Sequence, residues 1–307
     1  MTVSTDSAEI TDSEVESFRL EGYLIKEALY TTEEVALIRA VAEADPRKDE
    51  SHGRGGAKAE SRRSELWSIG NAGPKTPDVL SPDVTYDAIC FGERMLAAQS
   101  RLLLDNAKWP DDSLTLHHRK FILKDQLSYQ TPEQDETGQH GGNGFQWHQD
   151  YWYWGDYTKT GSDAYGGPGR PYPDLLIALI ALDEHTWNNG CLQVIAGSHR
   201  HRLNYRAEQW GERHAIREEV EELMAGGHEH VWCEMSPGSV VFFTPETLHQ
   251  SFPNGTSDPR WAFICCFDTM HNRPNGVTDR RKPAVPWSDN LLVDFGSQHL
   301  RRLRADT

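Results

Sequence analysis

The feature that most restricts the fold is a series of short apolar stretches that recurs across the middle of the chain. Residues 114–122 alternate in character, as the two faces of an extended strand do. Further apolar runs lie at 174–182, 191–195, 231–233, 239–243 and 261–267. Turn sequences such as Asn188-Asn189-Gly190 and Pro237-Gly238 separate them. Many short strands divided by turns predict a double-sheet sandwich or barrel.

Helical patterns flank this β region. Residues 11–14 and 31–34 have the spacing of capping boxes, and each is followed by apolar residues at helical spacing. Gly22 is expected to end the first helix, and a further helix is expected from Tyr86 to Leu104. We therefore expect one domain over residues 1–307, with a helical support region at 1–110, a β core at 111–275 and a C-terminal extension at 276–307.

The charge balance and the cysteines restrict the partners and the compartment. The chain has 31 Lys and Arg against 47 Asp and Glu, a formal net charge of −16, which repels nucleic acid and anionic membranes. We expect no nucleic-acid partner. The five cysteines form an odd set, which favours reduced thiols over a disulfide framework. Without a signal-peptide pattern or an apolar stretch long enough to span a membrane, we expect a cytoplasmic protein that does not bind membranes.

A histidine and an aspartate stand two residues apart at the end of a predicted strand. On an extended chain His148 and Asp150 project from one face, so both can reach a single metal ion. His249 follows the strand at 239–243 and is a candidate third ligand. Two His and one carboxylate leave coordination positions open and are the ligand set of non-haem iron(II) oxygenases. By itself, a His-x-Asp pair is more often a hydrogen-bonded surface pair.

An arginine follows the candidate ligand His249 at the start of the next strand. Arg260 shares a strand face with Ala262 and Ile264, and a guanidinium at the bottom of an apolar pocket is suited to bind a carboxylate. Beside a metal with open positions, it suggests a carboxylate-bearing cosubstrate that chelates iron. By itself, such an arginine more often begins an edge strand and faces solvent.

Several motifs in a fixed order make the sequence resemble a known family. They are the segments 144–151, 179–183, 189–195, 197–200 and 237–243, together with the His249 and Arg260 pair. In this order they resemble the phytanoyl-CoA dioxygenase family of iron(II)- and 2-oxoglutarate-dependent oxygenases, and the resemblance covers most of the chain. The segment 21–25 also resembles the family's N-terminal region.

This resemblance implies a fold and a set of site residues. The fold is mainly β with flanking helices, built on a double-stranded β-helix, the cupin-like jelly roll. Iron(II) is implied to bind at His148, Asp150 and His249, the catalytic centre. The distal carboxylate of 2-oxoglutarate is implied to bind Arg260 with help from Ser251, and Lys120 is placed in the cosubstrate pocket.

The implied reaction uses 2-oxoglutarate and O2, which become succinate and CO2 as a C–H bond of a small molecule is oxidised. Hydroxylation is the expected outcome. Oxidative cyclisation or desaturation at the same iron, for example on an amino sugar in natural-product biosynthesis, stays open.

The alternatives from other classes are a non-catalytic metal-binding jelly-roll protein and a zinc hydrolase. Asp150 retains the carboxylate that related halogenases lack, which disfavours halogenation. The run 151–155 differs from the signature of ectoine-type members, which disfavours ectoine as substrate.

Aromatic side chains crowd around the predicted iron ligands. Trp147, Tyr151, Trp152, Tyr153 and Trp154 either wall a substrate pocket or pack in the core. On an extended chain only alternate members would face the site. Aromatic walls in an acidic protein suggest a cationic or sugar-like substrate.

Three other histidines lie near predicted strands or turns, and their positions indicate whether each is structural or part of a site. His117 and His118 are neighbours in a predicted strand, so at most one faces the interior, and His118 is the candidate for the substrate pocket. His199 lies in a Gly-Ser-His turn and is expected to be structural. Two polar, glycine-bearing stretches at 131–144 and 155–173 flank the His-x-Asp segment and are predicted to be lid loops.

Overall fold

The computed structural model describes residues 9–46, 64–69, 82–104, 112–124, 144–154, 174–207, 213–272 and 282–305. For residues 64–69, 153, 154 and 207 it describes only the backbone. The two expected lid loops, at 131–144 and 155–173, lie almost entirely outside these ranges. Among the helices that are described, none is long and apolar enough to cross a membrane.

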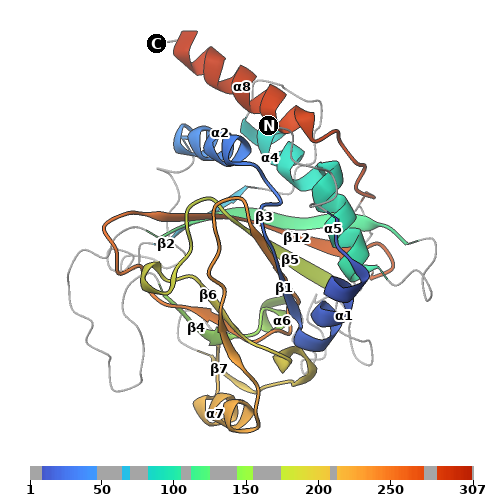
Figure 1. Cartoon of the computed structure of the whole chain (residues 1–307), viewed down its shortest axis with the longest axis vertical. Coiled ribbons are helices and arrows are strands. Elements are labelled where there is room, and N and C mark those ends of the chain that lie inside the picture. Colours follow the sequence, from blue (N-terminus) through green and yellow to red (C-terminus); the bar gives the residue numbers. More distant parts are fainter. Residues whose placement is uncertain are drawn as a thin grey trace.

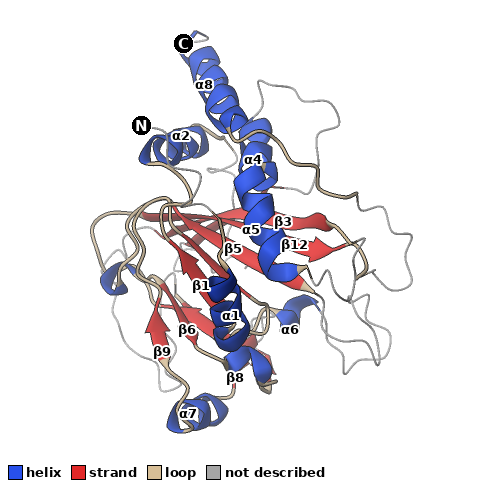
Figure 2. Cartoon of the chain, turned by 45° about the vertical axis from the view of Figure 1, so that its right-hand side comes forward, coloured by secondary structure: helices blue, strands red, loops and turns tan. Residues whose placement is uncertain are grey.

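Two antiparallel sheets form the core of the described chain (Figures 1 and 2). The larger has the strand order β1 (Tyr23–Lys26), β10 (Val240–Phe243), β5 (Leu175–Ala181), β12 (Arg260–Thr269), β3 (Leu114–Lys124) and β2 (Ser64–Ile69). The smaller has the order β4 (Phe145–His148), β11 (His249–Ser251), β6 (Leu192–Ile195) and β9 (His230–Trp232). A separate two-stranded ribbon pairs β7 (Tyr205–Ala207) with β8 (Arg213–Ala215). The sheets confirm the double-sheet core that the period-two segments predict.

Helices cover the outer face of the larger sheet (Figure 2). They are α1 (Asp12–Glu21), α2 (Thr32–Glu43), α4 (Pro82–Phe91) and α5 (Glu93–Leu103). The C-terminal α8 (Asn290–Ala305) packs against α2 and α4 and extends beyond the sheet. Two shorter helices, α6 (Tyr151–Trp154) and α7 (Arg217–Ala225), lie on the side of the smaller sheet (Figure 1).

The helix ends follow the capping signals in the sequence, with one exception. Both predicted capping boxes are present, at Thr11 and at Thr31, and α1 ends at Gly22 with φ of 78°. The single helix expected from Tyr86 to Leu104 was wrong, because the chain breaks at Gly92 into α4 and α5. At this break the C-terminal segment approaches through its backbone, because the Glu93 N–H donates to the Trp287 carbonyl and the Trp287 N–H donates to the Phe91 carbonyl.

Alternation along β12 gives the larger sheet two different faces. Trp261, Phe263, Cys265 and Phe267 pack with the helices in the main apolar core. Ala262, Ile264 and Cys266 belong to a second apolar cluster, which β12 shares with β5, β6 and β10. The side chains that face the smaller sheet therefore include every second residue of β12, beginning at Arg260.

A β-bulge interrupts the pairing of β3 with β12. Cys266 pairs with His118 and the next residue, Phe267, pairs with Leu116, so His117 is the extra residue. The bulge breaks strict alternation and brings His117 Nδ1 to 2.8 Å from His118 Nδ1. The expectation that these two rings point to opposite faces of the strand was therefore wrong.

Candidate active site

Two adjacent strands of the smaller sheet bring the predicted metal ligands together. His148 ends β4 and pairs directly with His249, which begins β11, and Asp150 follows two residues after His148. The Nε2 atom of His148 lies 3.6 Å from one oxygen of Asp150, and the Nε2 atom of His249 lies 3.9 Å from the other. The three donor atoms lie within 4.8 Å of one another.

Backbone carbonyl groups orient both imidazoles. His148 Nδ1 lies 2.6 Å from the carbonyl oxygen of Gln146, and His249 Nδ1 lies 2.8 Å from that of Thr247. Because a carbonyl oxygen only accepts hydrogen bonds, each Nδ1 carries the proton and each Nε2 presents a lone pair toward Asp150. Metal-binding histidines are fixed in the same way, so the residues present fit a metal ion.

The electrostatics hold the ligands in their metal-binding protonation states. Burial lowers the pKa of His148 to about 3, and the neighbouring His249 adds to the effect. Burial opposes ionisation of Asp150, but His249, His148 and Lys120 outweigh it and hold the pKa of that carboxyl below its usual value. A neutral imidazole and an ionised carboxylate are the forms that bind iron(II), so the donor set suits this ion.

The ligands open into a cavity between the two sheets. Its empty space is about 630 Å³, a volume that includes space open to solvent. The larger sheet contributes polar residues at both ends and an apolar wall between them, including Ile177, Leu179 and Ile264. Lys120 and His118, both predicted from the sequence, line it.

Two buried cations lie at one end of this cavity. Arg260 and Lys124 are 3% and 0% exposed and face each other as Cα partners across β12 and β3. Lys124 Nζ donates to Ser251 Oγ at 2.8 Å and to the Phe252 carbonyl at 2.5 Å. The nearest polar groups recorded for Arg260 are the ring nitrogens of His185, at 3.4 and 3.5 Å. Among the described lining residues, the only carboxylate is Asp150.

This concentration of positive charge is unfavourable without an anion. Burial, and then Arg260, hold the pKa of Lys124 well below its usual value. Burial lowers the pKa of Arg260 to about 10, and its Nε atom is buried without a hydrogen-bond partner. Buried like charges are costly unless an opposite charge pairs with them, so this end of the cavity is suited to hold a carboxylate.

Sequence reasoning missed Lys124. The predicted strand stopped at Ile122, whereas β3 continues to Lys124. Alternation from Lys120 through Ile122 places Lys124 on the cavity face, opposite Arg260, so a strand two residues longer would have indicated it.

The predicted aromatic cluster packs mostly away from the described cavity. Tyr151 and Trp152 lie in the short helix α6, so the alternation of a strand does not apply to them. The Trp152 ring packs on Tyr205 at 5.0 Å between centroids, and that of Trp147 lies 5.4 Å from His230. None of the three is among the described lining residues, and the side chain of Tyr153 lies outside the described residues.

Replacing Trp152 by Ala is expected to cost about 3–5 kcal/mol of folding free energy, because this side chain is only 1% exposed. Trp152→Phe keeps most of the packing and is expected to leave 2-oxoglutarate binding unchanged. Thermal unfolding and equilibrium binding measure the two effects. A Trp152→Phe protein with unaltered stability but weakened 2-oxoglutarate binding would show that this ring belongs to the site instead.

Comparisons with known proteins agree with this geometry. The family model for phytanoyl-CoA dioxygenase matches residues 18–262. An ectoine dioxygenase from Sphingopyxis alaskensis is 25% identical over 297 residues, 92% of this chain and 83% of that protein. The crystal structure of EctD from S. alaskensis with bound Fe aligns with a TM-score of 0.64 at 20% identity, covering 94% of this chain and 90% of that one. The carbocyclase SnoK from nogalamycin biosynthesis aligns with a TM-score of 0.56 at 19% identity, over 93% and 96% of the two chains. The structural matches confirm the expected jelly-roll fold.

Proposed function

The chain belongs to the phytanoyl-CoA dioxygenase family, and from this membership we propose that His148, Asp150 and His249 hold the iron(II) with which it oxidises a small molecule. The observation that carries the proposal is the placement of two sites in one cavity. The three donor atoms converge within 4.8 Å, and the carboxylate-binding pair Arg260 and Lys124 lines the same space. A metal and a dicarboxylate cosubstrate can therefore bind side by side.

When bound, iron(II) would supply the centre at which O2 is reduced while 2-oxoglutarate is oxidised to succinate and CO2. One oxygen atom of O2 enters succinate, and the other enters the alcohol product. The chain's own residues prepare this chemistry. Asp150 supplies a negative charge, and the Nδ1 hydrogen bonds fix the two imidazoles. Fixed donors lose little freedom when the metal binds, which favours affinity.

The cosubstrate would bind with its distal carboxylate at Arg260, Lys124 and Ser251. The guanidinium and ammonium groups supply opposite charge, and Ser251 Oγ, which accepts from Lys124, can donate its own proton to the carboxylate. The apolar side chains of Leu179, Leu192 and Ile264 line the space between. They exclude water, which strengthens the charge interactions.

The substrate would bind on the side of the iron ligands away from Arg260. Lys120 and His118 line the cavity there, and both interact electrostatically with Asp150. A positive lysine repels a cation and donates hydrogen bonds to hydroxyl oxygens. Of the two substrate types that the sequence suggested, this lining favours a sugar-like molecule over a cationic one.

The proposal is tested by iron-dependent formation of succinate from 2-oxoglutarate, measured with matched pairs of a neutral sugar and its amino-sugar counterpart. We expect O2 consumption and succinate formation in equal amounts, with greater stimulation by the neutral members. Mass spectrometry of the sugar product separates a hydroxylation (one added oxygen) from a desaturation or cyclisation (two lost hydrogens). Turnover that continues without O2 and without 2-oxoglutarate would point to hydrolysis and overturn the proposal. Ectoine is included as a comparison, and stimulation by ectoine alone would overturn the sugar assignment.

Replacing Lys120 by Met is expected to raise the KM for the stimulating sugar about 10-fold or more, because a hydrogen bond from a charged donor is lost. Steady-state succinate formation measures this effect. The affinity for 2-oxoglutarate should change little, since Lys124 and Arg260 remain. Lys120→Arg keeps the charge and should restore most of the sugar affinity. A rise in the KM for 2-oxoglutarate alone would instead place Lys120 with the cosubstrate, as the family resemblance implied.

A further inference from the structure

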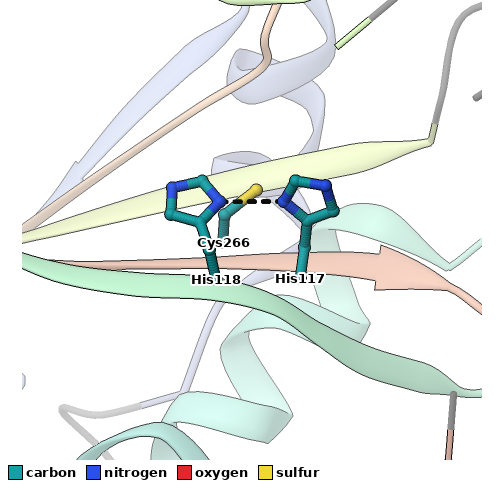
Figure 3. Close-up of side chains that lie close together, drawn as sticks. All are labelled: His117, His118 and Cys266. Atoms are coloured by element: carbon teal, nitrogen blue, oxygen red, sulfur yellow. Dashed lines mark hydrogen bonds between the residues drawn. The ribbon is translucent and has the colours of Figure 1, made fainter. Parts of the chain in front are cut away.

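A second group of metal-binding side chains lies on the larger sheet, separate from the iron ligands. His117, His118 and Cys266 come from the two paired strands β3 and β12, and their donor atoms lie within 4.8 Å of one another. In the described part of the chain only this group and the iron triad bring three such atoms together. Figure 3 shows the two imidazole rings facing each other beside the sulfur of Cys266.

The β-bulge at His117 creates this arrangement. Without the extra residue, neighbouring histidines on a strand would face opposite sides of the sheet. With it, the two Nδ1 atoms approach to 2.8 Å, and the rings meet nearly edge to face, with centroids 5.1 Å apart and an angle of 73°. Cys266, the Cα partner of His118, points to the same side of the sheet. Bulges of this kind commonly serve to redirect side chains at functional sites.

We propose that His117, His118 and Cys266 form a zinc site. Two imidazole nitrogens and one thiolate are ligands that Zn(II) prefers, whereas Mg(II) and Ca(II) prefer oxygen ligands. Zn–N bonds of about 2.0–2.1 Å place two tetrahedral nitrogen ligands about 3.3 Å apart. The present Nδ1 separation of 2.8 Å is about half an ångström shorter, a difference that small rotations of the two side chains can supply.

Zinc binding at this site requires a defined change in protonation. The Nδ1 proton that joins the two imidazoles moves to Nε2 of the donating ring, so both Nδ1 atoms offer lone pairs. Burial keeps the Cys266 thiol protonated in the absence of metal, since its pKa lies well above the usual value. One proton therefore leaves Cys266 for the solvent when the Zn–S bond forms, without any change of oxidation state.

The zinc site shares no ligand with the iron site, although it borders the same cavity and both His118 and Cys266 interact electrostatically with Asp150. Cys266 is six residues along β12 from Arg260, about 20 Å in an extended strand, so the ion would not occupy the carboxylate-binding end. His118 lines the cavity, and an ion on its Nδ1 atom would fix this ring as part of the wall. The proposal does not depend on the substrate or on catalysis.

Cobalt(II) titration of the full chain tests the zinc site without an activity measurement. The iron ligands include no sulfur, so near-ultraviolet thiolate-to-cobalt absorption reports only a site with a cysteine. We expect this band to appear with one equivalent of cobalt, to persist in His249→Ala, and to disappear when Zn(II) is added. It should be lost in Cys266→Ser and remain in the control Cys233→Ser, which replaces another fully buried cysteine.

Two outcomes would overturn the zinc site. One is the absence of the band from folded wild-type protein, and the other is a band of equal strength in Cys266→Ser. Circular dichroism establishes that each variant is folded. If Cys266→Ser does not fold, His117→Gln decides the question, because His117 is only partly buried. We expect this variant to bind cobalt at least about 10-fold more weakly than wild type, and unchanged affinity would contradict the proposal.

Discussion

Replacing His249 by Ala is expected to abolish iron binding and 2-oxoglutarate oxidation together. The change removes one of three converging donors and takes away one of the imidazoles that lower the pKa of Asp150. Loss of a residue that only hydrogen-bonds to a metal ligand typically costs about 10–100-fold in metal affinity or activity. Loss of a ligand itself should therefore cost more than about 100-fold. Iron content after anaerobic loading and succinate formation measure the two losses.

A matched control separates ligand loss from damage to the fold. His201→Ala removes an exposed histidine whose side chain lies outside the cavity lining, and this variant should retain iron and turnover. His148→Ala and Asp150→Ala should behave as His249→Ala does. Full iron content and turnover in any one of the three ligand variants would remove that residue from the metal site.

Replacing Arg260 by Ala is expected to weaken 2-oxoglutarate binding about 30-fold or more, while iron binding persists. Removing one partner of a buried, hydrogen-bonded charge pair costs about 2–5 kcal/mol, and each 1.4 kcal/mol is about tenfold in affinity. Lys124→Met should have an effect of the same kind, because Lys124 lies opposite Arg260 in the carboxylate-binding end. Equilibrium binding of 2-oxoglutarate to the iron-loaded protein measures the change.

The stability of the metal-free protein supplies a second, independent readout. Arg260 and Lys124 are buried cations that face each other, so removing either charge relieves a repulsion. Lys124→Met should therefore melt no lower than wild type while it binds 2-oxoglutarate more weakly. Arg217→Ala, which removes an exposed arginine paired with Glu221, should change neither property. A Lys124→Met protein with normal 2-oxoglutarate affinity would show that the cosubstrate does not use this lysine.

Local sequence patterns predicted most of the architecture and the three residues that the structure brings together as the proposed metal ligands. Alternation identified residues 114–122, which lie in β3, and an uninterrupted apolar run identified residues 261–267, which lie in the fully buried β12. The His-x-Asp pair needed only local geometry. His249 was added to the His-x-Asp pair as a candidate ligand because it closely follows a predicted strand. Its pairing with His148 in the smaller sheet could be seen only in the structure.

The features that the sequence did not reveal depend on contacts between distant segments. The break at Gly92 coincides with backbone hydrogen bonds to Trp287, nearly two hundred residues away. The bulge at His117 is a property of the pairing with β12 and cannot be seen in β3 alone. The chain turns into α6 directly after Asp150, which redirects the aromatic residues that were expected to alternate along a strand.

Anaerobic titration shows whether one cavity binds iron(II) and 2-oxoglutarate together. Metal-free protein receives iron(II) and then 2-oxoglutarate while the visible spectrum is recorded. Chelation of iron by the keto acid should produce a charge-transfer band that needs both additions, is lost in His249→Ala, and requires much more 2-oxoglutarate in Arg260→Ala. A folded, iron-loaded wild-type protein that shows no such band at saturating 2-oxoglutarate would contradict the account.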